Sequence, residues 1–227
     1  MREKKPDKPF KDWLYEEVGD TFGITRKFKS ALFDHFATLQ LAENHPKRED
    51  IEELRLLAFE YIDSWNEDEY KFMFISRFIG LVHFVSPYYK VFTQRMMQVK
   101  YDNDSKMTEG IVEFMLAKGI QSPKKPHFFL HEYKPESPPL SPQIGGIKGG
   151  DPLGQLLIAM VASQKLNQDE KPIYGIYVNG RNWFLVVLEG KEYVVSEPYS
   201  ITGEAIFALF AVLDYFKNLM DSLYKQP

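Results

Sequence analysis

One helix in the second half of the chain limits the folds that are open to it. Asp151 followed by Pro152 marks its start, because Asp accepts hydrogen bonds from free N–H groups and Pro suits the first helical position. The residues that follow, LGQLLIAMVASQKLNQ, are apolar on most of the helix circumference. A helix with this pattern is buried on all sides. The fold must therefore pack other elements around it.

Three strands are predicted before this helix. Residues 88–101 alternate and are rich in strand-forming residues, and DNDS at 102–105 is a turn signal. Residues 110–119 read as the returning strand and residues 125–134 as the next one. A loop dense in Pro and Gly, 135–150, then leads to the buried helix. The spacing predicts a strand, a returning strand and a third strand, followed by a helix.

More strands follow the helix. IYGIYV and RNWFLVVLEG flank Asn179-Gly180, a strong hairpin signal, and KEYVVSEP continues the pattern. A final helix, EAIFALFAVLDYFKNLMDSLY, ends the run of predicted elements. Helices thus alternate with groups of strands along the chain. This order predicts a mixed α/β domain with helices packed on a central sheet.

Helices are predicted in the first part of the chain. Apolar residues recur at helical spacing over 26–42 and 50–65. A third helix is expected from Asn66 to about residue 84, because Asn66 and Glu69 fit a capping box. We therefore predict a helical extension over residues 1–65 and a core with a C-terminal helix over 66–227.

Composition narrows the functional classes. Among 227 residues, 44% are apolar, yet no run approaches the roughly 18–20 uncharged apolar residues of a membrane span. The N-terminus lacks the apolar run of a secretory signal, and the chain has no cysteine, so a cytoplasmic location is expected. The net charge of −4 argues mildly against constitutive binding of nucleic acid. It is compatible with an enzyme that engages DNA transiently, and a homo-oligomer stays open.

Charged residues interrupt two of the apolar strands. Glu113 stands within IVEFMLA, and Glu132 and Lys134 lie near the end of the strand HFFLHEYK. An unpaired carboxylate in such surroundings costs several kcal/mol until it finds a partner, a proton or a cation. If the two strands pair, the two carboxylates converge at one end of the sheet and offer the oxygen ligands that Mg²⁺ prefers. The alternative is a strand-end salt pair with Glu113 turned outward.

Two further residues are candidates beside this cluster. Gln155 lies in the first turn of the buried helix and can point its amide over the strand ends; a capping or solvent-facing role is the alternative. The glycines of IGGIKGGDPLG lack the Gly-Lys-Ser/Thr ending of a phosphate-binding loop. We interpret that segment as a lid in which Lys148 contacts a phosphate.

The ordered set of segments resembles a known superfamily. A helix with an acidic residue, a hairpin with another, a strand with E-x-K and a helix with an early Gln are typical of the PD-(D/E)xK, restriction endonuclease-like superfamily. The resemblance runs from about Asn66 to Val195, and its details are similar to an uncharacterised bacterial group within that superfamily. It implies a core of a helix, three antiparallel strands, a helix and further strands.

The resemblance also implies metal-dependent hydrolysis of phosphodiester bonds. By analogy Glu113 and Glu132 bind Mg²⁺ or Mn²⁺ with the carbonyl of Tyr133, and Lys134 assists the attacking water. Gln155 supports the site, and Glu69 is the acidic residue of the first helix. Val112-Glu113 stands where the superfamily has proline and aspartate. The hypothesis is a DNA nuclease; the alternative is a catalytically inactive scaffold or binding module that keeps the fold.

Overall fold

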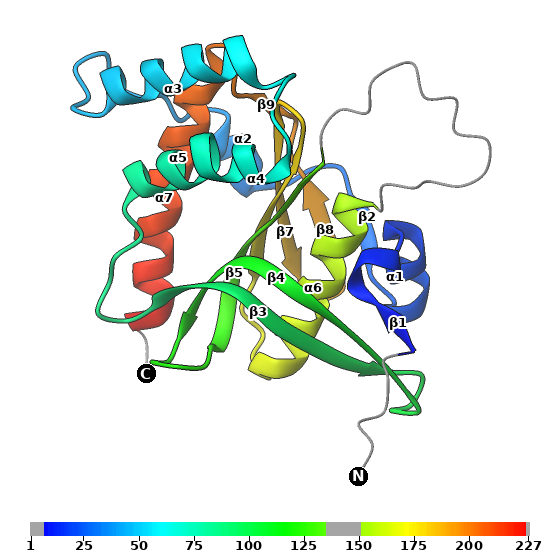
Figure 1. Ribbon diagram of the computed structural model, residues 1–227. Coiled ribbons are helices and arrows are strands. Elements are labelled where there is room, and N and C mark those ends of the chain that lie inside the picture. The colour runs from blue at the N-terminus through cyan, green and yellow to red at the C-terminus, as the bar shows by residue number, and fades with distance from the viewer. Residues whose placement is uncertain (1–6, 135–150, 226–227) are drawn as a thin grey trace.

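The molecule is built on a central mixed sheet that has helices on both faces (Figure 1). The computed structural model describes residues 7–134 and 151–225, with the backbone alone for 129–134. The sheet order is β1-β4-β5-β6-β7-β8-β2, with β3 paired to β4 and β9 paired to β7. The mixed α/β architecture predicted from the sequence is confirmed.

The elements have the following bounds. The strands are β1 (Lys8–Pro9), β2 (Thr25–Lys27), β3 (Lys90–Tyr101), β4 (Lys106–Lys118), β5 (Lys124–Lys134), β6 (Ile173–Asn179), β7 (Asn182–Glu189), β8 (Glu192–Val195) and β9 (Tyr199–Ser200). The helices are α1 (Tyr15–Phe22), α2 (Ala31–Phe36), α3 (Arg48–Tyr61), α4 (Glu67–Tyr70), α5 (Ser76–Val82), α6 (Pro152–Asn167) and α7 (Ala205–Lys225). Two short turns complete the set, the 3-10 helix η1 (Phe10–Asp12) and the π-helix η2 (Lys71–Ile75).

The three strands predicted before the buried helix form as expected. β3 pairs with β4 along its whole length, and β4 pairs with β5, both antiparallel. β5 and β6 are parallel neighbours, and α6 lies between them in the chain. Parallel strands require such a crossover, because a tight turn cannot connect them. The β6–β7 hairpin also forms at the predicted position, with Gly180 at a positive φ of 55° in its turn.

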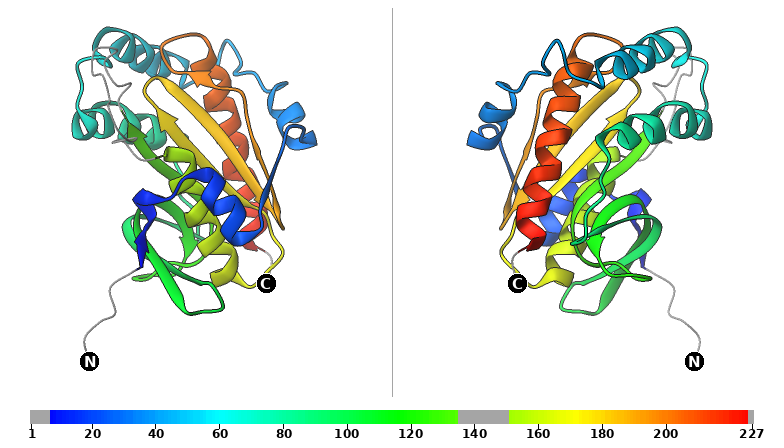
Figure 2. Two further views of the ribbon diagram at one scale, coloured as in Figure 1. Left: turned by 90° about the vertical axis from the view of Figure 1, so that its right-hand side faces the viewer. Right: turned by 90° about the vertical axis from the view of Figure 1, so that its left-hand side faces the viewer.

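Helix α6 is buried as its sequence predicts. Its hydrophobic residues from Leu153 to Ala162 are at most 7% exposed. The sheet covers one side, and η1 and α1 cover the other (Figure 2). Asp151 caps the helix through Oδ1, which accepts from the Leu153 N–H at 3.0 Å, while Oδ2 accepts from the Tyr15 N–H at 2.7 Å. The cap thus also fixes α1 against α6.

Gly154 allows this close packing. A Cβ at that position would lie 2.3 Å from the Trp13 carbonyl oxygen, closer than real Cβ contacts come. The opposite face of the sheet is covered by α3, α5 and α7, whose apolar residues form a second cluster with β6 and β7. The two layers of side chains together form the hydrophobic core.

The helix that begins at residue 66 carries the predicted capping box. Asn66 Oδ1 accepts from the Glu69 N–H at 3.0 Å, and Glu69 Oε2 accepts from the Asn66 N–H at 2.8 Å. The helix continues from α4 through η2 into α5. It ends at His83, which adopts the left-handed conformation. The predicted helix over 50–65 also forms, as α3.

The helix predicted over residues 26–42 is wrong. Residues Thr25–Lys27 form β2, which pairs in parallel with β8, and only Ala31–Phe36 is helical. Strand pairing with a segment far away in the chain replaces the first part of the helix, and local helical spacing does not reveal such pairing. The first 65 residues also supply β1, which pairs with β4. No helix among the described residues is long and apolar enough to cross a membrane.

Candidate functional site

The β4–β5 ladder brings the charged positions to one end of the sheet. The ladder ends with the pair Phe114–Leu130, so Glu113 on one strand and residues 131–134 on the other follow it in the same direction. The β5–β6 register shifts between His131 and Tyr133, which leaves Glu132 at an irregular position. The side chains of Glu132, Tyr133 and Lys134 lie outside the described residues, and so does Lys148.

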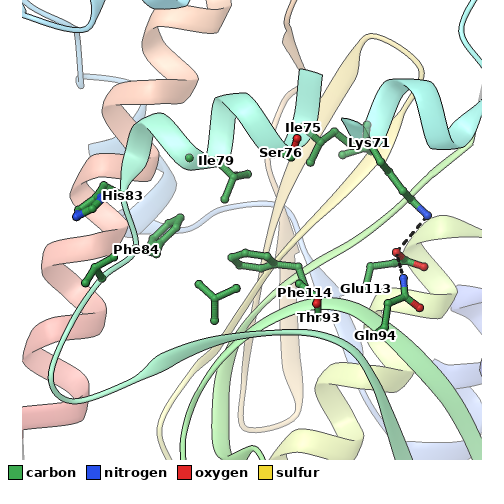
Figure 3. Close-up of a pocket in the computed structure, with 14 residues that line it drawn as sticks. Lys71, Ile75, Ser76, Ile79, His83, Phe84, Thr93, Gln94, Glu113 and Phe114 are labelled. Atoms are coloured by element: carbon green, nitrogen blue, oxygen red, sulfur yellow. Dashed lines mark hydrogen bonds and ion pairs between the residues drawn. The ribbon is translucent and has the colours of Figure 1, made fainter. Parts of the chain in front are cut away.

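Glu113 is held by two neighbours that the sequence did not point to. Its side chain is 20% exposed, and Oε2 accepts a hydrogen bond from Gln94 Nε2 at 2.6 Å (Figure 3). The same oxygen lies 3.1 Å from Lys71 Nζ. Gln94 lies between the residues that pair with Phe114 and Val112, and its φ of 52° is positive.

Lys71 connects Glu113 to the helix that begins after Asn66. Its Nζ lies 2.5 Å from Glu67 Oε1, one helical turn away, and 3.1 Å from Glu113 Oε2 on β4. Burial alone would lower the pKa of Lys71, but the hydrogen bonds to both carboxylates outweigh it, and the pKa is raised. The ammonium is therefore charged at neutral pH. One positive and two negative charges give these three groups a net charge of −1.

A cavity of about 480 Å³ opens beside this cluster. The helix α5 with the end of η2 forms one wall, and β3 with β4 forms the other (Figure 3). The walls are mostly apolar, while Lys71, Glu113 and Gln94 stand together at one end. Val178 of β6 also lines it, and its Cα partner in β5 is Tyr133. The cavity therefore lies next to the end of β5 that carries Glu132 and Lys134.

The other predicted residues lie elsewhere. Gln155 is 3% exposed, and its Nε2 lies 3.4 Å from the Lys11 carbonyl oxygen, in a weak hydrogen bond to the N-terminal segment. Glu69 completes the capping box. Neither residue lines the cavity. Of the predicted residues with described side chains, Glu113 alone belongs to the cluster at the cavity.

Lys71 and Gln94 were missed because nothing local distinguishes them. A lysine one turn after Glu67 reads as an ordinary i,i+4 pair on a helix surface. Within the described part of the chain, no group of three or more His, Asp or Glu side chains is arranged to hold a metal ion. Neither the family models nor the curated proteins include a match to this chain.

Proposed function

We propose that the chain is a metal-dependent nuclease that hydrolyses the phosphodiester bonds of DNA. The observation that carries the proposal is the register of β4 and β5, in which Glu113 and the Glu132–Lys134 segment follow the same end of the ladder. The order of a helix at 66–82, three antiparallel strands, α6 and a parallel strand β6 also supports a restriction endonuclease-like core.

Each residue has a proposed role in this function. Glu113 and Glu132, with the Tyr133 carbonyl, would hold Mg²⁺ or Mn²⁺, since carboxylate and carbonyl oxygens suit these cations. A bound cation supplies Lewis-acid stabilisation of the phosphate. Lys134 orients the attacking water, and Lys148 contacts a phosphate.

Gln155 takes a modest part in this proposal. Its amide lies in the first turn of α6 and bonds to the backbone of the segment before α1. We assign it to supporting the site through the position of that segment. Glu69 has its role in the capping box, and the metal site needs no contribution from it.

One observation favours the second candidate function, a catalytically inactive scaffold with the same fold. Lys71 lies 3.1 Å from Glu113 and already partly neutralises the carboxylate that would bind the metal. In a scaffold, Glu113 would serve only to form this ion pair with Lys71. A nuclease would require instead that a divalent cation compete with Lys71 for Glu113 or share the carboxylate with it.

Metal titration separates the two candidates. Calorimetry with Mn²⁺ on the intact protein should reveal a site that is lost in both Glu113→Gln and Glu132→Gln. Glu197→Gln, the same change at an exposed position between β8 and β9, serves as the control. Cleavage of plasmid DNA should need the metal and should disappear in the same two variants. Absence of Mn²⁺ binding to the unmodified protein would establish the scaffold.

A further inference from the structure

The cavity beside Glu113 has the size and walls of a binding site for a small ring system. Its volume of about 480 Å³ lies within the range of small-molecule sites. Phe84 and Phe114 contribute aromatic rings that pack against each other, with their centroids 6.3 Å apart. Ile75 and Ile79 line the cavity from the helix above (Figure 3). Such walls favour a flat apolar body.

The charges of the cavity limit the ligand further. Among its lining residues, the lysine and the carboxylate are Lys71 and Glu113, which are paired with each other at one end. Polar atoms are otherwise supplied by Ser76, His83, Thr93 and Gln94. The body of the ligand is therefore uncharged, with polar atoms on its edge.

We infer that the cavity receives a nucleobase that has left its stack, and this inference rests on the proposed nuclease function. A phosphate at the cation proposed to bind Glu113 would have a base attached through its own sugar, and Glu113 also lines the cavity. Val178, the neighbour of Tyr133, continues the cavity toward the end of β5. An unstacked base between apolar and aromatic side chains is bound by stacking and by hydrogen bonds to its edge.

Gly80 offers a way to fill the cavity without disturbing the fold. It lines the cavity on α5, and a Cβ built there meets no atom within 4 Å. Gly80→Leu therefore adds a side chain in open space. Gly203→Leu is a matched control, because its Cβ also meets nothing within 4 Å and the residue lies before α7, away from the cavity.

The experiment compares ligands with and without a base. In the presence of Mn²⁺, calorimetry measures the affinity of the unmodified protein for each of the four deoxynucleoside 5′-monophosphates and for 2-deoxyribose 5-phosphate. We expect at least one nucleotide to bind about tenfold more tightly than the sugar phosphate, because of base stacking. Gly80→Leu should lower the affinity for that nucleotide to the affinity for the sugar phosphate. Gly203→Leu should leave the affinity for the nucleotide unchanged.

The outcomes distinguish the inference from the function on which it rests. If Mn²⁺ binds and DNA is cleaved, but nucleotide and sugar phosphate bind equally, the base pocket is wrong and the nuclease stands. The same holds if Gly80→Leu keeps the preference for nucleotides. If Mn²⁺ does not bind and DNA is not cleaved, the nuclease itself is wrong and the inference falls with it.

Discussion

The polar side chains at the two ends of the β4–β5 pair differ in their burial and in their hydrogen-bond partners. At the Lys118–Lys124 end, His127, Ser163 and Asn167 are at most 4% exposed and bond to one another or to the Pro126 carbonyl. Tyr224 of α7 adds hydrogen bonds to this cluster, and we refer to it as the sealed end. At the Phe114–Leu130 end, Glu113, Gln94 and Lys71 stand at the mouth of a cavity. This is the open end.

The difference suggests two purposes for polar groups in one sheet. Those of the sealed end satisfy backbone groups where the strands turn, and their removal leaves buried atoms unpaired. Those of the open end are partly exposed, and they contact each other and Glu67. Partly exposed ion pairs contribute little to stability. The sealed end should therefore decide the stability of the protein, and the open end should decide what it binds.

Tyr224→Phe should produce the largest effect. The hydroxyl donates to the Leu116 carbonyl at 2.7 Å, accepts from the His127 N–H at 3.1 Å and lies 3.1 Å from the Lys125 carbonyl. Burial raises the pKa of this phenol, so the hydroxyl stays protonated. Its loss leaves buried backbone groups unpaired, and we expect the free energy of unfolding in urea to fall by about 2–3 kcal/mol.

Tyr89→Phe is the matched control for this change. The Tyr89 ring lies 5.3 Å from that of Tyr224, and its hydroxyl has no hydrogen-bond partner among the described residues. Burial raises the pKa of Tyr89 to about 12. Removal of its hydroxyl should be neutral or slightly stabilising. Equal losses in the two variants would show that ring packing, and not hydrogen bonding, holds the sealed end.

The pH dependence of stability should also come from the sealed end. Burial lowers the pKa of His127 below its ordinary value, although Asp169, at 3.6 Å, opposes this effect. Lys171 and Lys125 lower it further. The unfolded chain binds a proton as the pH falls through about 6.5, while the folded chain does not until lower pH. The contribution of the neutral His127 to the free energy of unfolding is therefore fully present above that pH and declines as the pH falls below it.

Urea unfolding at pH 7.5 and pH 5.5 measures this contribution. Between pH 7.5 and pH 5.5, the free energy of unfolding of the unmodified protein should fall by up to about 1.4 kcal/mol more than that of His127→Gln. His35→Gln removes an exposed histidine and should keep the pH dependence of the unmodified protein. Identical pH slopes for the unmodified protein and His127→Gln would mean that His127 titrates alike in the folded and unfolded chains.

Gly80→Ala tests the open end by a gain of stability. The glycine lies inside α5, where Gly is about 1 kcal/mol less favourable than Ala, and the added methyl group meets open space. We expect the free energy of unfolding to rise by about 0.5–1 kcal/mol in urea. A loss would mean that the helix must approach another group closely at this point.

Local signals in the sequence predicted much of the fold. The Asn66–Glu69 capping box, the Asp151-Pro152 start and the Asn179-Gly180 hairpin each depend on neighbouring residues, and all three form. The failure at residues 26–42 has the opposite origin, because β2 exists only through its pairing with β8. At the site, the E-x-K strand and Glu113 were visible as charges in apolar strands.

What was missed depends on contacts between distant segments. Lys71 and Gln94 meet at Glu113 from a helix and from the neighbouring strand, and no local pattern predicts that meeting. The sequence does not predict the cavity either, apart from one signal. A glycine inside an otherwise apolar helix is unfavourable, and Gly80 marks the wall of the cavity.

Glu113→Gln should have the smallest effect on stability. Glutamine keeps the length of the side chain and an oxygen that can accept from Gln94, and Lys71 keeps its contact with Glu67. The lost ion pair is partly exposed, so the free energy of unfolding in urea should change by less than about 0.5 kcal/mol. A loss above about 1.5 kcal/mol would make Glu113 a structural residue like those of the sealed end. A near-zero change together with lost Mn²⁺ binding would mean that a carboxylate in an apolar strand serves a ligand and not the fold.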